Sequence, residues 1–135
     1  MNKMQPRALV VEDDPTTRAM LKALIESMGC TVEEAADGEE AIEKLDDKDY
    51  SVVLLDIVLP KVSGTQVMEH LHAFAPDMLE RVIVVTGLNV DDIRRLFPTV
   101  CHALTKPVMP GRLRESITKC LQLQIDEQLS FGLIS

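Results

Sequence analysis

The chain has 135 residues, of which 46% are hydrophobic, 27% charged and only 3% aromatic. These proportions are typical of one folded domain with an aliphatic core, and they exclude a disordered chain. The 14 basic and 22 acidic side chains leave a net charge of −8, which argues against nucleic acid as a direct partner. Because the sequence has neither a signal peptide nor the roughly 20 consecutive apolar residues of a membrane span, we expect a cytoplasmic protein without a membrane partner.

In the first half of the chain, the apolar pattern predicts a strand, a helix, a strand, a helix and a strand. The three strands cover about residues 7–12, 31–35 and 51–56. Asp14 precedes a proline and is expected to cap the first helix, and Asp37 is expected to cap the second. The apolar residues expected to face the core are Met20, Leu21, Leu24, Ile25 and Met28 in the first helix and Ala41, Ile42 and Leu45 in the second.

In the second half, the pattern predicts a helix, a strand, a short helix, a strand and a last helix. The two strands cover residues 81–86 and 101–105, and Pro98 ends a weak helix over 91–97. The last helix begins near Pro110. The apolar residues expected to face the core are Val67, Met68, Leu71 and Phe74 in the third helix and Leu113, Ile117, Cys120 and Leu121 in the last.

Five strands separated by helices predict an α/β fold, in which a five-stranded parallel sheet carries five helices on its two faces. Ligands of such sheets bind outside the carboxyl ends of the strands. Four of the predicted strands end in groups that phosphate chemistry requires. These groups are Glu12, Asp13, Asp56, Thr86 and Lys106.

The chemistry of these groups points to phosphoryl transfer at a magnesium ion. Mg²⁺ prefers oxygen ligands and takes one or two carboxylates, which Asp13 and Asp56 would supply. A carboxylate can also attack phosphorus and form an acyl phosphate, so Asp56 is the candidate nucleophile. Lys106 and the hydroxyl of Thr86 would stabilise the charge on the transferred oxygens.

Taken in order, these motifs resemble those of the receiver domain of two-component response regulators. The resemblance covers residues 7 to about 124. The motifs that carry it are the acidic pair Glu12-Asp13, Asp56 with Pro60 four residues later, Thr86, and Lys106-Pro107. Each motif alone is weak, but their order at successive strand ends is specific.

The resemblance implies a flavodoxin-like, doubly wound sheet of strand order 2-1-3-4-5. It implies that a sensor histidine kinase or a histidine phosphotransfer protein donates a phosphoryl group to Asp56. It also implies that Glu12 holds a metal-bound water and that the carbonyl of Val58 completes the protein ligands of Mg²⁺. Phosphorylation would draw Thr86 towards Asp56 and switch the face formed by the fourth predicted helix and the fifth strand.

Residues 1–124 are expected to form the receiver domain, and residues 125–135 a C-terminal tail or truncated linker. The tail is too short for an effector domain, so the output domain or effector protein is unknown. Apolar tail residues favour contact with a partner, such as a second copy in a homodimer. They are Ile125, Leu129, Phe131, Leu133 and Ile134.

The chain departs from the family pattern at its signalling face. Ala103 stands three residues before the lysine, where family members often carry a switching Tyr or Phe. The chain would then report phosphorylation otherwise or more weakly, and Phe97 and His102 are the candidates to replace that ring. The apolar residues Val58 and Leu88 flank the path of an attacking water and predict slow self-dephosphorylation. We therefore expect an autocatalytic phosphoacceptor and not an enzyme that turns over substrate.

Three other functions compete with this interpretation. A phosphohydrolase of the haloacid-dehalogenase type would need a second Asp two residues after the nucleophile, where this chain has Val58. A nucleotide or flavin binder would need a Gly-rich or Ser/Thr-rich loop after the first strand, where the chain is acidic. A phosphorylation-independent interaction module on a receiver scaffold is the main alternative, because the altered signalling face fits it.

The remaining residues with chemical potential are expected to be structural. The three cysteines, Cys30, Cys101 and Cys120, form no Cys-x-x-Cys pair and are interpreted as buried reduced thiols. The histidines are not spaced as a metal trio and are interpreted as structural or exposed, and three methionines are assigned to the core. These residues are His70, His72 and His102, and Met20, Met28 and Met68.

Overall fold

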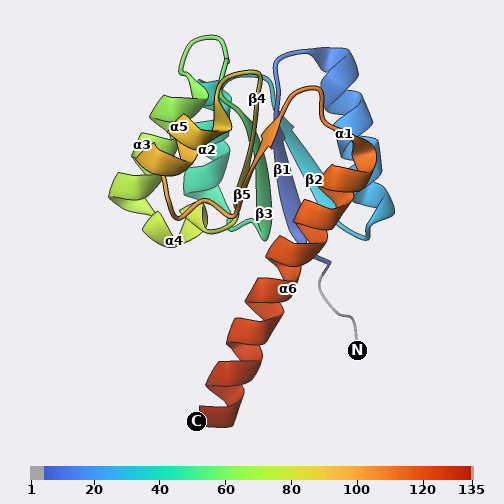
Figure 1. The fold of residues 1–135 in the computed structure, drawn as a ribbon, viewed down its shortest axis with the longest axis vertical. Coiled ribbons are helices and arrows are strands. Elements are labelled where there is room, and N and C mark those ends of the chain that lie inside the picture. The colour runs from blue at the N-terminus through green and yellow to red at the C-terminus, as the bar shows by residue number, and fades with distance from the viewer. Residues whose placement is uncertain (1–4, 135) are drawn as a thin grey trace.

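The computed structural model describes the backbone of residues 5–134 and the side chains of residues 5–124. Five parallel strands form one sheet in the order β2-β1-β3-β4-β5 (Figure 1). The strands are β1 (Arg7–Val11), β2 (Thr31–Ala35), β3 (Val52–Asp56), β4 (Val82–Thr86) and β5 (His102–Thr105). This confirms the predicted doubly wound α/β fold and its strand order.

Within the described residues six helices cover the two faces of the sheet, one more than predicted. They are α1 (Pro15–Ser27), α2 (Gly38–Asp47), α3 (Gly64–Phe74), α4 (Pro76–Leu79), α5 (Val90–Leu96) and α6 (Pro110–Ile134). The unpredicted helix, α4, is a single turn with Pro76 at its first position, too short to show a helical period in the sequence. The five predicted helices are present.

Side-chain caps define where several helices begin. The carboxylate of Asp14 accepts a hydrogen bond from the Thr17 amide at 2.8 Å, and that of Asp37 accepts one from the Glu40 amide at 2.8 Å. Both predicted caps are confirmed. Ser63 caps α3 in a reciprocal capping box with Gln66, which was not predicted.

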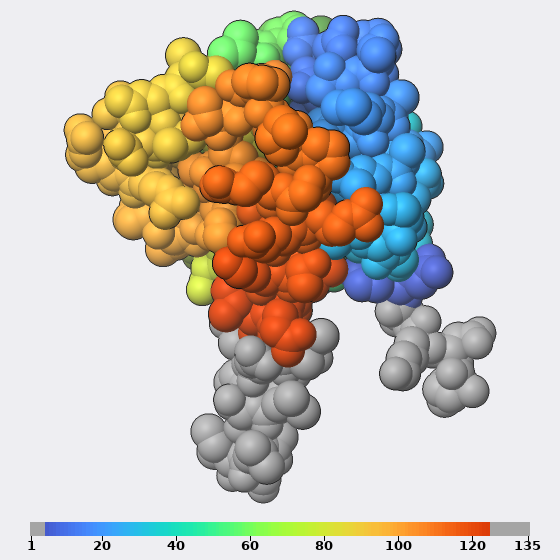
Figure 2. Space-filling view, turned by 45° about the vertical axis from the view of Figure 1, so that its right-hand side comes forward, coloured from blue at the N-terminus to red at the C-terminus, as the bar shows by residue number. Residues whose placement is uncertain are grey.

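The core consists of two apolar layers, one on each face of the sheet. Side chains of α2, α3, α4 and α5 pack on one face, and side chains of α1 and α6 pack on the other. Figure 2 shows α6 lying beside α1 over this second face. Strand β3 is buried along its whole length, as expected for a central parallel strand.

Two residues assigned to the core lie at the surface instead. Met20 is 56% exposed and Phe74 is 75% exposed. In α1, Leu21 and Ile25 face the sheet, and Met20 lies about a quarter turn away from that stripe. Phe74 is the last residue of α3, where the helix passes the edge of the packed layer.

The interpretation of all three cysteines as reduced thiols is wrong for two of them. Cys101, just before β5, and Cys120, in α6, form a disulfide with a Cα–Cα separation of 6.2 Å. Cys30 is buried and free, as expected. The pair is 19 residues apart in sequence, and only the packing of α6 against the start of β5 brings the two sulfurs together.

Helix α6 continues well past the domain body (Figure 1). The boundary expected between residues 124 and 125 therefore falls inside one continuous helix, and the division into domain and tail stays a prediction. The apolar tail residues predicted to contact a partner lie outside the described side chains. Among the described residues, no helix combines the length and the apolar character that crossing a membrane requires.

Candidate functional site

Three carboxylates meet at the carboxyl ends of two neighbouring strands. Glu12 and Asp13 follow β1, and Asp56 is the last residue of β3, which pairs with β1 in parallel. One oxygen from each carboxylate lies within 4.8 Å of those of the other two. Glu12 and Asp56 are buried, whereas Asp13 is exposed, so the cluster opens to solvent on the Asp13 side.

The ammonium group of Lys106 reaches into this cluster from the end of β5. Its Nζ donates to Asp56 Oδ2 at 2.7 Å and to Glu12 Oε1 at 3.2 Å. Burial alone would lower the pKa of Lys106, but the hydrogen bonds to Asp56 and Glu12 raise it overall. The lysine is therefore held charged beside the candidate nucleophile.

The surroundings of Glu12 make its carboxyl harder to ionise than an ordinary glutamate. Burial raises the pKa of Glu12 above its ordinary value, although hydrogen bonds from the Asp14 amide and from Lys106 act in the opposite direction. The charge of Asp56 adds to the rise. Two buried acids thus share one lysine, which leaves negative charge that a cation would neutralise.

Backbone amides hold the side chains of Asp56 and Thr86 in place. The Val58 amide donates to Asp56 Oδ1 at 3.1 Å, and the Leu88 amide donates to Thr86 Oγ1 at 3.0 Å. Thr86 ends β4 beside Asp56 and is fully buried. The side chains of Val58 and Leu88 are 64% and 52% exposed and stand at the rim of the site. From the sequence only the Val58 carbonyl was predicted to take part in the site, and the hydrogen bond from the Val58 amide to Asp56 was not predicted.

Gly64 fixes the loop that follows Asp56. Its amide donates to the Ile57 carbonyl at 2.8 Å. A Cβ at this position would collide with the backbone oxygen of Asp56 and the Cα of Ile57. The sequence showed a glycine in this loop but gave no sign that it touches the backbone of the candidate nucleophile. At the other side of the site, the Lys106–Pro107 peptide bond is cis.

The histidines remain apart from this site. His70 pairs with Asp46 at 2.8 Å on the surface of α3, and His102 lies near the Cys101–Cys120 disulfide. The placement of His70 agrees with its interpretation as structural, whereas His102 stands close to two sulfur atoms.

The donor set of the acidic cluster fits a hard divalent cation. The three side chains offer carboxylate oxygens, the ligands that Mg²⁺ prefers, and the exposed side leaves room for waters. Glu12, Asp13 and Asp56, predicted from the sequence as a metal site, are brought together. The Val58 carbonyl belongs to the same loop, directly after Asp56 and Ile57.

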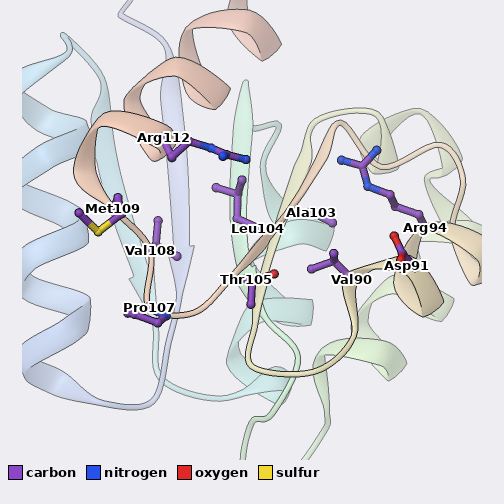
Figure 3. A pocket seen from close by; sticks show the side chains of 10 residues that line it. All are labelled: Val90, Asp91, Arg94, Ala103, Leu104, Thr105, Pro107, Val108, Met109 and Arg112. Carbon is purple, nitrogen blue, oxygen red and sulfur yellow. The ribbon is translucent and has the colours of Figure 1, made fainter.

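Beside the site, the face built by α5, β5 and the start of α6 contains a pocket of about 450 Å³. Figure 3 shows Val90 and Ala103 on its wall, with Arg94 and Arg112 towards its two sides. Ala103 is 7% exposed, and its methyl group occupies the position where the resemblance leads one to expect an aromatic ring. The pocket therefore lies at the position where such an aromatic side chain would pack or change rotamer.

Comparisons with known proteins agree with this geometry. The family model described as the response regulator receiver domain matches residues 8–118. The Regulator of RpoS of Escherichia coli is 33% identical over 114 residues, which cover 84% of this chain and 34% of that protein. The chain thus spans about a third of the length of this relative.

Solved structures show the same fold. A CheY-like receiver domain protein of Methanospirillum hungatei is 32% identical with a TM-score of 0.82, covering 92% of this chain and 99% of that one. The response regulator protein TrrA of Thermotoga maritima, solved in complex with Mg²⁺-BeF, is 27% identical with a TM-score of 0.76. It covers 86% of this chain and 99% of that one. This chain belongs to the response regulator receiver domains of two-component systems.

Proposed function

We propose that this receiver domain accepts a phosphoryl group on Asp56 and that Mg²⁺ supports the transfer. The observation that carries the proposal is the contact of Lys106 Nζ with Asp56 Oδ2 at 2.7 Å, inside a cluster of three carboxylates. The contact pairs a candidate nucleophile with a fixed positive charge. The donor would be a phosphohistidine of a sensor histidine kinase or of a histidine phosphotransfer protein.

In the proposed reaction, an Asp56 oxygen attacks phosphorus while the bond from phosphorus to the donor nitrogen breaks. The electron pair of that bond leaves with the donor imidazole, and Asp56 becomes an acyl phosphate. Lys106 neutralises charge on the transferred oxygens, and the buried hydroxyl of Thr86 donates to one of them.

Glu12, Asp13 and Asp56, with the Val58 carbonyl, are the residues that would hold Mg²⁺. The ion would supply positive charge against the phosphoryl oxygens. Three observations support a magnesium ion here. The cluster offers carboxylate oxygens, and its three acids carry more negative charge than the single ammonium group of Lys106 can neutralise. The related protein TrrA was solved in complex with Mg²⁺-BeF.

The proposal includes a slow loss of the phosphoryl group and no turnover of an external substrate. Val58 and Leu88 place apolar side chains at the rim of the site, where neither can orient a water molecule by hydrogen bonding.

We also propose a cytoplasmic location, where ATP is available to the kinase that supplies the phosphoryl group. An output domain, an effector protein or a second copy of the chain would read the phosphorylated state.

A second function is a phosphorylation-independent interaction module. The observation in its favour is the pocket beside Ala103, where a partner could bind. Alanine has no ring whose change of rotamer could report phosphorylation. This module would bind its partner equally well with Asp56 phosphorylated or free.

The deciding experiment is intact-protein mass after incubation with Mg²⁺ and acetyl phosphate. We expect the wild type to gain one phosphoryl group and Asp56→Asn to gain none. Asp14→Asn is the matched control, since Asp14 is an exposed helix cap beside the site and asparagine preserves the cap. No gain in the wild type while Mg²⁺ still raises its melting temperature would favour the interaction module.

The metal has its own test. Mg²⁺ should raise the melting temperature of the wild type in proportion to the logarithm of its concentration above the dissociation constant. Asp13→Asn should lose most of this shift, because Asp13 is the exposed carboxylate of the cluster. An equal shift in both proteins would remove Asp13 from the proposed ligands.

A further inference from the structure

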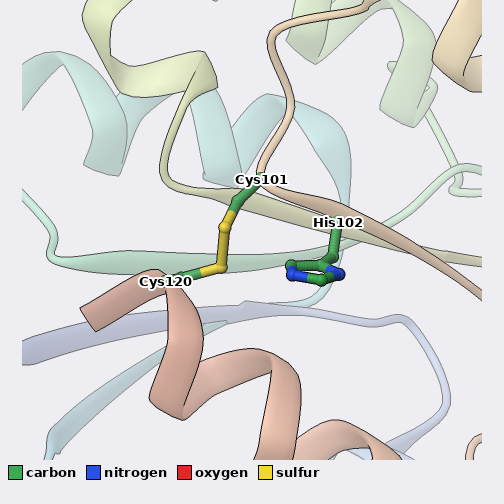
Figure 4. A group of neighbouring side chains, drawn as sticks. All are labelled: Cys101, His102 and Cys120. Atoms are coloured by element: carbon green, nitrogen blue, oxygen red, sulfur yellow. A yellow bond between two sulfur atoms is a disulfide. The ribbon is translucent and has the colours of Figure 1, made fainter. Parts of the chain in front are cut away.

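A second chemical group lies far from the acidic cluster, at the opposite end of β5. Cys101, immediately before the strand, is joined to Cys120 of α6 (Figure 4). Lys106 follows the other end of the same strand. The cystine therefore stands at the amino-terminal edge of the sheet, and the candidate phosphoacceptor site stands at the carboxyl-terminal edge.

His102 lies beside this disulfide. Its ring nitrogen and the two sulfur atoms all lie within 4.8 Å of one another. Figure 4 shows the imidazole and the disulfide on the same side of the chain. Burial, together with the positive charges of Arg94 and Lys119, lowers the pKa of His102. The imidazole beside the two sulfurs is therefore kept neutral, and it is a weaker proton acceptor than an ordinary histidine.

The two cysteine residues differ in exposure. Cys120 is 2% exposed, whereas Cys101 is only half-buried. A reagent from solvent would therefore meet Cys101 first, and Cys120 would react only with a sulfur already bound to Cys101. Cys30, the third cysteine, is a buried free thiol of the same core layer, and burial raises the pKa of its thiol.

We propose that Cys101 and Cys120 form a reversible thiol–disulfide exchange site whose reactant is a low-molecular-weight thiol or disulfide. Starting from the reduced pair, Cys101 loses its proton to His102 or to water. Its thiolate attacks one sulfur of the small disulfide, whose S–S bond breaks and releases one thiolate. A mixed disulfide on Cys101 remains.

Cys120 completes the exchange. Its thiolate attacks Sγ of Cys101, the bond to the small molecule breaks, and a second small thiolate leaves. Two protein thiols have then lost two electrons and two protons, and the small disulfide has become two thiols. The same steps in reverse, driven by an excess of the small thiol, open the bond.

The disulfide attaches α6 to the start of β5 near the point where the helix leaves the domain body. Leu113, Ile117 and Cys120 are the buried apolar residues of this helix, and Cys120 is the last of them among the described side chains. Beyond it, Leu121 is partly buried and Gln124 donates to the Ser51 carbonyl before the helix leaves the domain body (Figure 1). The oxidised form thus fixes α6 covalently to the start of β5, and the reduced form leaves this attachment to packing.

The experiment starts from the full chain, reduced and freed of reductant, then exposed to oxidised glutathione and measured as intact mass. The wild type should close its disulfide, ending about 2 Da lighter than the reduced chain and without an adduct. Cys120→Ser should stop at one glutathione adduct on Cys101, and Cys101→Ser should gain little adduct. Cys30→Ser is the control and should close like the wild type.

Equal adducts on Cys101→Ser and Cys120→Ser, or a wild type that never closes, would overturn the proposal. Reduced protein that retains a zinc ion and resists oxidation would also overturn it, since the three residues would then be metal ligands. Should Cys120→Ser not fold, Cys120→Ala replaces the buried thiol with a small apolar group and gives the same readout.

Stability provides an independent measurement. Reduction should lower the melting temperature of the wild type by roughly 10 °C, because the bond closes a loop of about 20 residues. The melting temperature of Cys120→Ser should not respond to reductant. Phosphoryl gain from acetyl phosphate should be unchanged in Cys120→Ser, so this site and the proposed function can fail separately.

Discussion

The ammonium group of Lys106 lies 2.7 Å from Asp56 Oδ2, although the two residues are 50 positions apart and come from strands that are not neighbours. Strand β4 runs between β3 and β5, and the lysine crosses its end to reach the carboxylate. The same ammonium group also binds Glu12. One cation therefore stabilises two buried acids, and this relationship makes the site sensitive to any change in charge.

Replacing Lys106 with methionine should destabilise the metal-free protein. Two buried carboxylates would lose their cation, and we expect the free energy of unfolding to fall by about 1–2 kcal/mol after allowing for solvent screening of the partly exposed lysine. Urea unfolding measures the change. In the double variant Lys106→Met/Asp56→Asn the loss should be smaller than the sum of the single losses. Additive losses would show that Lys106 and Asp56 are not coupled. Lys119→Met, on the surface of α6, is the control and should change the free energy of unfolding little.

Polar side chains at the rim should shorten the life of the acyl phosphate. Val58→Asn with Leu88→Glu introduces groups that can orient an attacking water, so we expect dephosphorylation to become roughly tenfold faster. Both side chains are more than half exposed, and the fold should tolerate the changes. Decay is followed by intact mass after removal of the donor. Leu123→Asn, an exposed apolar position on α6, is the control, and unchanged decay in the double variant would refute the shielding role.

Gly64→Ala should disturb the site through the backbone. The added Cβ would collide with the backbone of Asp56 and Ile57, so we expect a loss of about 1–3 kcal/mol in the free energy of unfolding and slower phosphorylation of Asp56. Gly111→Ala is the matched control, since a Cβ there meets nothing within 4 Å. Because alanine favours helix, it should leave stability unchanged or raise it by up to about 1 kcal/mol. Equal effects of the two substitutions would contradict the assigned contact.

Acid should weaken the fold in part through Glu33. Burial would raise the pKa of this carboxyl, but the hydrogen bond from Lys48, with further help from Tyr50 and Arg7, lowers it below the ordinary 4.5. A lowered pKa in the folded state means that the contribution to stability is present above about pH 4.5 and is lost as pH falls through the folded value.

Urea unfolding at pH 7 and at pH 3.5 tests this dependence. Glu33→Gln should lose less stability between the two pH values than the wild type, since its side chain carries no charge to titrate. Glu43→Gln, at an exposed position of α2, should follow the wild type. A pH dependence of Glu33→Gln as steep as that of the wild type would show that the contacts of Glu33 do not contribute.

Sequence patterns were enough to predict the alternation of strands and helices, the two aspartate caps and the strand ends that carry Glu12, Asp13, Asp56, Thr86 and Lys106. These features are local or follow from one rule. Apolar runs and capping residues act over a few positions, and the carboxyl ends of parallel strands meet at one edge of a sheet. The acidic cluster and its lysine could therefore be predicted before the fold was known.

Contacts between segments distant in sequence could not be predicted in this way, because they depend on packing. The Cys101–Cys120 disulfide, the fit of Gly64 against Asp56 and the exposure of Met20 depend on how helices seat on the sheet. Helical spacing marks a broad apolar stripe, but only packing selects which part of it is buried. Likewise, two cysteines without a spacing motif become a pair when a helix and a strand bring their Cα atoms to 6.2 Å, a separation that no local pattern encodes.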